Sequence, residues 1–315
     1  MSGLVQGADG RQREAEMMSG MFVQSSSFDA DTAVGTSLQQ RERIARYYRE
    51  ADFDYNAVWR SNRTLARHFG FGDGVGHDDS MALANQHLAD LAAVRSGSRV
   101  LDCGCGLGGT SIWMVRERNG IATGVDLLEH QIARARKEAA RAGVADKAHF
   151  ITGDFTATRL PAERFDVALA QESLCHVERK EQFYREAYRL LVPGGRLLIA
   201  EYMRLGRNRS TVEEAMIRSW CDGWVMPDLL TGPEHAAAAR AAGFRQVDVI
   251  DATADVSPSL ARLHRRASFC FPLHRVLRAL GLRTEMQHGN ITAALFQFEA
   301  SQRGFWFYGL LRALK

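Results

Sequence analysis

Cysteine is scarce in this 315-residue chain, and its five cysteines form no CxxC pair. An odd number of scattered thiols argues against both a disulfide framework and a cysteine-based zinc site. Apolar runs are short as well, because no stretch reaches the roughly 20 residues that a membrane-spanning helix needs. The first residues lack a basic segment followed by an apolar core, so we expect no signal peptide and a reducing, cytoplasmic location.

A strong excess of charge is also missing, since the formal net charge is only +3. The chain therefore lacks the basic balance that is typical of nucleic-acid-binding proteins. With 46% hydrophobic and 24% charged residues, its composition is that of an ordinary globular protein. We therefore expect a small-molecule substrate and no nucleic-acid partner.

Strand and helix patterns alternate from about residue 98 onward and predict an α/β fold. We expect a Rossmann-like, mostly parallel, seven-stranded sheet with helices on both faces, which binds its ligand at the carboxyl ends of the strands. Residues 1–35 are polar and aperiodic and predict a mobile tail. Residues 36–96 predict an N-terminal helical lid and residues 97–315 the core, with cap insertions at about 203–230 and 257–283.

A glycine-rich turn follows the first predicted strand, in the sequence VLDCGCGLGG from Val100 to Gly109. Gly104 and Gly106 carry no Cβ, so the backbone there can approach a ligand closely. The amides at the start of the next helix offer unpaired donors. The GxGxxG pattern alone is shared with dinucleotide-binding enzymes, so it indicates only a nucleotide-like ligand.

Carboxylates follow three of the predicted strands. Asp102 directly precedes the glycine turn, and Asp154 ends the third strand. Asp126 ends the second strand, about 20 residues after the first glycine, where a pair of ribose hydroxyls is held in such folds. A site lined by carboxylates suits a ligand with an ammonium and a sulfonium group better than one with two phosphates.

Five spaced segments together resemble the class I S-adenosylmethionine-dependent methyltransferases. These segments are VLDCGCGLGG, ATGVDLLEHQ, ITGDF, FDVALAQESLCHV and LLVPGGRLLIAEY. The resemblance implies S-adenosyl-L-methionine as cofactor, held at its methionine end, ribose, adenine and sulfonium by residues at the strand ends. The implied cofactor-binding residues are Asp102, Gly104, Gly106, Asp126, Leu127, Gln131, Asp154, Phe155 and Gln171.

A narrower resemblance lies in QESLCHV, residues 171–177, which is similar to the strand-four motif of the sterol, tocopherol and prenyl-diphosphate C-methyltransferases. Glu172, Cys175 and His176 match the E-x-x-C-H pattern of the sterol enzymes. The pair Tyr47-Tyr48 and the segment HFGFGD, residues 68–73, are similar to features upstream of the glycine turn in those families. This resemblance implies methyl transfer to an alkene carbon of a small isoprenoid, such as the allylic prenyl diphosphate geranyl diphosphate.

Such a reaction gives Glu172 a chemical purpose. Methylating an alkene carbon leaves a carbocation, and a carboxylate in an apolar pocket can stabilise that cation and then remove a proton. Aromatic faces stabilise a cation without reacting with it, although aromatics in a lid are also expected to form a packed core. The aromatic and histidine candidates for substrate binding are Tyr47, Tyr48, His68, Phe69, Trp220 and Trp224.

His176 supports an alternative, because a histidine is the natural base for an oxygen or nitrogen acceptor. The chain would then be an O-, N- or C-methyltransferase of a terpenoid or aromatic natural product. Two other classes stay open at this point: a dinucleotide oxidoreductase, which Asp102 and Asp154 disfavour, and a non-catalytic cofactor-binding protein.

Two segments carry arginines and no acidic residue, namely residues 55–72 and 257–283. Arg60 lies in the first, and in the second the i, i+3, i+4 spacing of Arg262, Arg265 and Arg266 puts them on one helical face. Arginine forks suit phosphate oxygens, so these residues are candidates for binding an anionic acceptor such as a diphosphate, together with Mg²⁺. A solvated face or ion pairs with distant acids would explain them equally well. The metal ligands stay unassigned, and the lid helices and aromatic cap predict a homo-oligomer.

Overall fold

The computed structural model describes residues 35–59, 61 and 63–315. The predicted tail lies outside this part of the chain except for Gly35. The Gly35 amide donates to Gln182 Oε1 at 2.7 Å, and its carbonyl accepts from Arg179 Nη2 at 2.8 Å. Both backbone groups of this last residue are therefore bound to the core, and the mobility of the tail stays a prediction.

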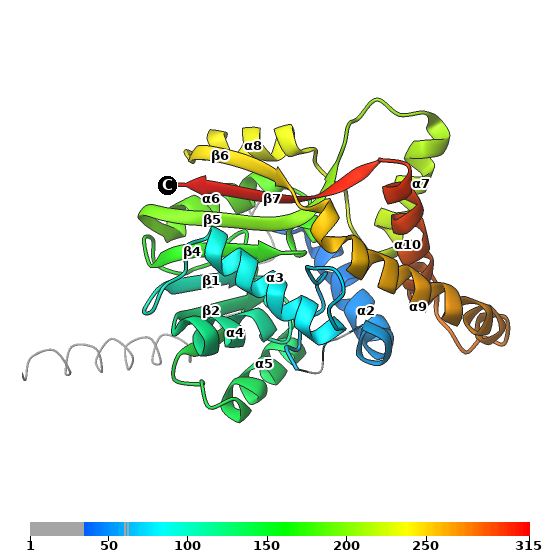
Figure 1. Cartoon of the computed structure of the whole chain (residues 1–315), viewed down its shortest axis with the longest axis horizontal. Helices are drawn as coiled ribbons and strands as arrows, with labels where there is room; N and C mark the ends of the chain where they lie inside the picture. Colours follow the sequence, from blue (N-terminus) through cyan, green and yellow to red (C-terminus); the bar gives the residue numbers. More distant parts are fainter. Residues whose placement is uncertain (1–34, 60, 62) are drawn as a thin grey trace, which may run out of the picture. The chain divides into compact units, whose positions relative to one another are not determined.

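A single seven-stranded sheet forms the centre of the fold (Figure 1). Its strands run in the order β3-β2-β1-β4-β5-β7-β6; β1 to β5 are parallel, and β7 is antiparallel to both of its neighbours. The strands are β1 (Arg99–Cys103), β2 (Ile121–Asp126), β3 (Ala148–Thr152), β4 (Phe165–Gln171), β5 (Leu191–Arg204), β6 (Arg245–Asp251) and β7 (Trp306–Leu314). The predicted Rossmann-like, mostly parallel sheet is therefore confirmed, with its order reversing beside β1 and β4.

Four helices connect strands of the sheet: α4 (Gly109–Arg118), α5 (Glu129–Arg141), α6 (Lys180–Leu190) and α8 (Gly232–Ala241). Helix α5 buries Ile132, Ala135 and Ala139 at helical spacing, so one apolar side faces the core. Helix α8 begins with a capping box, in which the side chain of Thr231 and that of Glu234 each bond the other's backbone amide. These helices place the strand ends and the glycine turn.

Strand β5 is longer than its sequence predicts. Proline and glycine are typical turn residues, yet the strand begins at Leu191 and continues through Pro193, Gly194 and Gly195. Gly194 has a φ of +79°, a conformation that favours glycine, and its amide donates to Lys315 O at 3.1 Å. The hydrogen bond to Lys315 thus keeps this glycine-rich segment in the strand. At the other end β5 takes in Met203 and Arg204, which were expected in the cap.

Of the remaining helices, α3 (His77–Leu91) lies across one face of the sheet, and most of the others gather beyond the carboxyl ends of the parallel strands (Figure 1). The others are α2 (Leu38–Asp54), η1 (Tyr55–Trp59), η2 (Leu174–His176), α7 (Thr211–Gly223), α9 (Thr253–Ala279) and α10 (Glu285–Gln302). The predicted lid corresponds to α2, η1 and α3, and the two predicted caps contain α7 and most of α9. Within the described ranges, no helix is both long and apolar enough to cross a bilayer.

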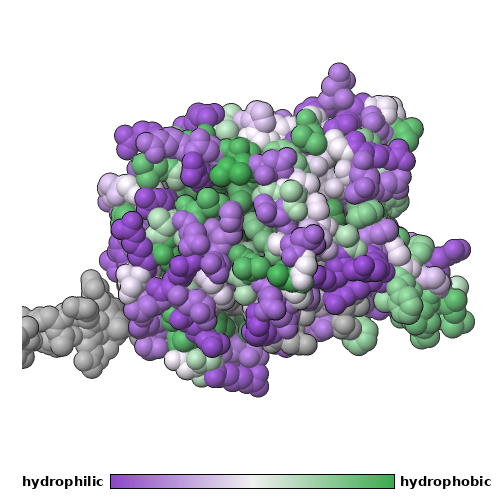
Figure 2. Space-filling view, viewed as in Figure 1, coloured by the Kyte–Doolittle hydropathy of each residue, from purple (hydrophilic) through white to green (hydrophobic). Residues whose placement is uncertain are grey.

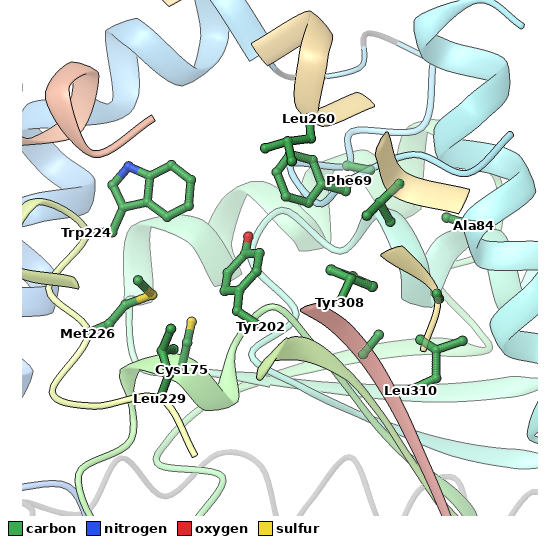
Figure 3. Close-up of a cluster of buried hydrophobic side chains, with 14 of the residues drawn as sticks. Phe69, Ala84, Cys175, Tyr202, Trp224, Met226, Leu229, Leu260, Tyr308 and Leu310 are labelled. Carbon is green, nitrogen blue, oxygen red and sulfur yellow. The ribbon is translucent and has the colours of Figure 1, made fainter. Parts of the chain in front are cut away.

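Polar side chains dominate the face drawn in Figure 2, whereas apolar side chains gather at the projecting end of α9 and α10. Inside, one aromatic core joins the helices to the sheet (Figure 3). Tyr202 on β5 and Tyr308 on β7 contact the ring of Phe69 with centroid separations of 6.0 and 6.2 Å. The segment before α3 is therefore packed directly onto the sheet.

Helices α7 and α10 cross at two glycines. An ideal Cβ on Gly223 would lie 2.4 Å from the carbonyl oxygen of Gly289 and 2.8 Å from Ala293 Cβ. Real Cβ atoms do not approach a backbone oxygen so closely, so only glycine permits this contact between the two helices.

Gly223→Ala is therefore expected to lower the free energy of unfolding by about 1–3 kcal/mol, because the added methyl forces α7 and α10 apart. Gly206→Ala is the control, since nothing lies within 4 Å of its ideal Cβ. That change should leave stability nearly unchanged or raise it slightly. Urea unfolding of both variants measures the difference, and equal effects would contradict the helix contact.

Candidate active site

A cavity of about 360 Å³ lies at the carboxyl ends of β1, β2 and β4, beneath α2, α9 and α10. The glycine turn and the strand ends form one part of its wall, and the helices form the other. All nine residues implied in cofactor binding line it: Asp102, Gly104, Gly106, Asp126, Leu127, Gln131, Asp154, Phe155 and Gln171. The tertiary structure thus brings this predicted set together.

The glycine turn packs closely against neighbouring loops of the protein. Gly104 has a φ of +79°, and an ideal Cβ there would lie 2.4 Å from Ser173 Cβ. The Gly106 amide donates to Asp126 Oδ2 at 3.0 Å, while Asp126 Oδ1 accepts from the Leu128 amide at 2.9 Å. Asp126 therefore ties the loop after β1 to the loop after β2 and fixes the shape of this wall.

Two interacting carboxyls lie in this wall, the buried Asp102 and the half-buried Asp126. The pKa of Asp102 is raised to about 6, mainly by burial and to a smaller extent by the charge of Asp126, although a hydrogen bond from Ser111 Oγ at 2.6 Å opposes the rise. Burial also raises the pKa of Asp126 above its ordinary value. A ligand that carries positive charge would relieve this repulsion, as the sequence analysis expects.

Asp154 is already satisfied by the protein. Its Oδ2 accepts from the Thr36 amide at 2.6 Å and from Arg41 Nη2 at 3.1 Å. Its Oδ1 accepts from the amide and the hydroxyl of Thr156 at 2.9 and 2.7 Å. A carboxylate has about four acceptor sites, so little capacity is left for a ligand amino group. Instead, Asp154 holds the start of α2 over the cavity.

Gln171 presents the opposite situation. Its Oε1 accepts from the Thr110 hydroxyl at 3.2 Å, whereas its buried Nε2 has no hydrogen-bond partner among the described residues. Buried donors are normally paired, so an unpaired amide in a cavity wall is suited to an acceptor group of a ligand. This observation supports a bound small molecule at the end of β4.

Glu172 is held by three donors from three different elements. Its Oε1 accepts from the Phe69 amide at 2.7 Å and from the Tyr308 hydroxyl at 2.8 Å, and its Oε2 accepts from the Tyr202 hydroxyl. Its φ of +50° lies in the left-handed region, which costs a non-glycine residue conformational energy. Burial raises the pKa of Glu172 to about 7, although the three hydrogen bonds oppose that rise.

Aromatic rings surround this carboxyl. Figure 3 shows the Tyr202 ring between Trp224 and Phe69. The Tyr202 and Trp224 centroids are 6.1 Å apart, and Phe69, Tyr202 and Trp224 all line the cavity. The wall beside Glu172 is therefore apolar and rich in π faces, the surface that stabilises a cation without reacting with it.

His176 lies on the same wall but is neutral. Burial lowers the pKa of His176 to about 4. Its Nδ1 lies 3.3 Å from the carbonyl oxygen of Val225, which can only accept, so we assign the proton to Nδ1. The Tyr48 hydroxyl then donates to Nε2 at 3.0 Å. The basic nitrogen is thus engaged by a lid tyrosine.

The predicted substrate-binding residues divide into two groups. Five of them line the cavity: Tyr48, His68, Phe69, Trp224 and Arg266. Trp220 does not, because it is fully buried against Tyr202 and Trp306, and its prediction as a substrate contact is wrong. Tyr47 is likewise buried away from the cavity, with its hydroxyl bonded to Tyr55 and Asn290.

Two predicted arginines also stand apart from the cavity. Arg265 does not line it and is exposed on α9, so its prediction as a substrate contact is wrong too. Arg60 lies outside the described residues.

Arginines of the two acid-free segments form ion pairs with acidic residues from other parts of the fold. Arg67 pairs with Asp52 at 2.5 Å, Arg283 with Asp54 at 2.7 Å, and Arg278 with Glu285 at 2.8 Å. These pairs correct the expectation of two basic patches reserved for phosphate. Among the residues that can be described, no group of three or more His, Cys, Asp or Glu is placed to hold a metal.

Several residues of the site are not indicated by any local pattern in the sequence. Tyr202 ends the segment LLIAEY, but nothing in its pattern shows that its hydroxyl reaches Glu172. Tyr308 lies on an antiparallel strand more than a hundred residues away, and no local signal connects it to β4. The far wall of the cavity comes from α9 and α10, through Leu263, Cys270, Leu273, Leu277, Ile291 and Ala294.

Comparisons with known proteins agree with this geometry. Residues 101–199 match the family model described as methyltransferase domain. A sterol 24-C-methyltransferase of Gibberella zeae is 32% identical over 158 residues, covering 50% of this chain and 41% of that protein. The chain spans about half the length of the curated relatives it matches first, from 41% to 50%.

Two solved structures share the fold at low identity. The cyclopropane synthase MmaA2 of Mycobacterium tuberculosis has a TM-score of 0.75 at 13% identity, covering 89% of this chain and 99% of that one. The geranyl diphosphate C-methyltransferase of Streptomyces coelicolor A3(2) has a TM-score of 0.64 at 17% identity, covering 89% and 99%.

The raised pKa of Glu172 predicts a pH-dependent stability. The folded chain binds a proton there that the unfolded chain releases above about pH 4.5, so the stability contribution falls as pH rises toward the folded pKa of about 7. Glu172→Gln should therefore gain about 1–3 kcal/mol relative to wild type between about pH 5 and pH 8. Glu117→Gln, which removes an exposed carboxyl on α4, is the control. Chemical unfolding measures the stability of wild type and both variants at the two pH values. The assignment would be contradicted if the stability of Glu172→Gln relative to wild type were the same at both.

Proposed function

We propose that this chain, which contains a class I S-adenosylmethionine-dependent methyltransferase domain, methylates an alkene carbon of an isoprenoid and uses Glu172 as the base. The observation that carries the proposal is the position of Glu172. It is a carboxyl with a pKa of about 7, on the cavity wall, among aromatic rings and next to the expected cofactor residues.

The residues around the glycine turn fit the cofactor. Gly104 and Gly106 line the cavity, the carboxylate of Asp126 would hold two ribose hydroxyls, and Gln171 offers an unpaired amide. When bound, S-adenosyl-L-methionine supplies an electrophilic methyl group on a sulfonium. Asp102 adds negative charge near the methionine end, which favours an ammonium group.

Residues of the chain then stabilise and deprotonate a carbocation. Once the new carbon–carbon bond has formed, the acceptor carries a positive charge that must be kept from water. Phe69, Tyr202 and Trp224 present π faces to this space. Glu172 takes a proton from a neighbouring carbon, and the electrons of that C–H bond restore an alkene. Tyr202 and Tyr308 hold the carboxylate in place for that transfer.

His176 fits the base role less well. A group with a pKa of about 4 is a weak base at neutral pH, and its Nε2 already accepts the Tyr48 hydroxyl. A carboxyl with a pKa of about 7 is half ionised at neutral pH, where it is best matched to accept a proton. The contrast favours carbon methylation over a phenol or amine acceptor.

For the acceptor we propose an allylic prenyl diphosphate such as geranyl diphosphate. The geranyl diphosphate methyltransferase of the same fold supports this choice, as does Arg266 in the cavity wall. The ion pairs of Arg67 and Arg283 instead favour a second candidate, a neutral isoprenoid alcohol or a sterol with a side-chain alkene. Labelled S-adenosylmethionine offered with geranyl diphosphate, with geraniol or with such a sterol separates the three. Turnover of a phenol or amine alone would overturn the proposal.

Glu172→Gln should lower turnover by roughly 10²–10⁴-fold, because the carboxamide cannot accept the proton. Binding of S-adenosylhomocysteine, measured by calorimetry, should stay near the wild-type value. His176→Gln is the matched control, with a much smaller loss. The wild-type rate should rise with pH through a limb near the Glu172 pKa of about 7. A limb near the His176 pKa of about 4, or a larger loss in His176→Gln, would assign the base to His176.

Asp126→Asn should weaken S-adenosylhomocysteine binding by roughly tenfold or more, since it removes one charged acceptor for the ribose hydroxyls. Asp166→Asn is the control, because Asp166 pairs with Arg99 at the opposite, amino end of β4. Calorimetry measures both variants. Equal affinity in the two would place the ribose away from Asp126.

A further inference from the structure

Helix α9 carries a stripe of large apolar side chains that nothing in the described chain covers. Phe269, Leu273, Val276 and Leu280 are 85%, 64%, 57% and 67% exposed. Phe269, Leu273 and Val276 lie on one face of the helix at a spacing of four and three residues, and Leu280, the residue that caps its end, follows four residues later. Figure 2 shows the apolar surface at this projecting end of α9 and α10. Exposed apolar surface of this extent marks an interaction site.

Basic residues accompany the stripe along residues 257–283, where Arg278 and Arg283 pair with Glu285 and Asp54 of other helices. Residues 257–283 include six arginines and no Asp or Glu. Arg265, one turn before Phe269, and Arg275, one residue before Val276, are both exposed. Neither makes an ion pair with any residue that the structure describes. The surface therefore combines an apolar face with unneutralised positive charge.

The stripe is continuous with the mouth of the cavity. Leu273 lines the cavity and is also exposed. Phe53, from α2, lines the cavity as well and is 69% exposed. Leu277 and Cys270, on the inner side of α9, continue the wall inward. An apolar molecule in contact with the stripe thus meets an apolar path into the site.

We infer that α9 docks this protein on an anionic lipid surface, with Phe269, Leu273, Val276 and Leu280 among the acyl chains and Arg265 and Arg275 at the headgroups. Amphipathic helices bind the bilayer interface through buried apolar area together with attraction to anionic lipid. The acceptor then enters between Phe53 and Leu273 directly from the lipid. This second statement rests on the proposed function, whereas the docking does not.

A second copy of the chain is the competing occupant. Packing two such faces together would bring the unpaired arginines of both copies close, without an acid on either stripe to neutralise them. Like charges facing each other across an interface are costly. An anionic surface neutralises the same arginines, and for this reason the charge pattern favours lipid.

Co-sedimentation of the full chain with vesicles tests the docking, without any methyl acceptor present. Binding is expected to phosphatidylcholine vesicles that contain phosphatidylglycerol, and to be much weaker with phosphatidylcholine alone. Phe269→Ser/Val276→Ser and Arg265→Gln/Arg275→Gln should each lower the partition coefficient by about tenfold or more. Val212→Ser, at a 72% exposed position on α7, and Arg116→Gln, exposed on α4, are the matched controls.

Two results would overturn the inference. The first is an absence of wild-type binding to anionic vesicles, or an equal loss in the control variants. The second is a wild-type dimer in lipid-free solution that Phe269→Ser/Val276→Ser converts to a monomer, since the stripe would then belong to a second copy. Retained S-adenosylhomocysteine binding shows that each variant is folded. Because vesicle binding is measured without an acceptor, failure to methylate an isoprenoid would leave the docking result standing.

Discussion

The hydrogen bonds to Glu172 are the interaction on which the site depends. The Phe69 amide, the Tyr202 hydroxyl and the Tyr308 hydroxyl converge on one carboxyl, and they come from the segment before α3, from β5 and from β7. A buried carboxyl is costly unless its oxygens are bonded, so it draws these three elements to one point. The same bonds set the orientation of the group that we propose takes the proton. Glu172 therefore both joins these three elements through hydrogen bonds and provides the proposed base.

The features that suit Glu172 to act as a base also lower the stability of the folded protein. Glu172 is held in the left-handed region and has a pKa of about 7, and both features cost the folded state free energy at neutral pH. Its neighbour Glu201 is buried as well, and burial raises the pKa of Glu201 to about 8, with the charge of Glu172 adding to the rise. Glu201 accepts from the amides of Cys175 and Tyr202. A mostly protonated second carboxyl keeps added negative charge away from the base.

The arginines of the helices around the cavity fall into two groups, those in ion pairs and those that face solvent. Arg67 and Arg283 pair with Asp52 and Asp54, so they hold α2 and its neighbours together. Arg265 and Arg275 face solvent beside the apolar stripe of α9. The wall that α9 and α10 give the cavity is mainly apolar, and the two arginines without an ion pair among the described residues lie on the outer surface of α9. This distribution links the proposed acceptor to the proposed lipid surface.

The sequence by itself determined the parallel sheet, the glycine turn and the cluster Asp102, Asp126 and Gln171, because periodicity and strand-end position are local signals and parallel strands end on one edge. It also singled out Glu172. Only the tertiary structure decided that Tyr202 and Tyr308 hold Glu172, that Trp220 is core, that Asp154 anchors Thr36, and that distant acids neutralise Arg67 and Arg283. These contacts join residues far apart in the chain, and no local pattern records which side chains a fold will bring within hydrogen-bonding distance.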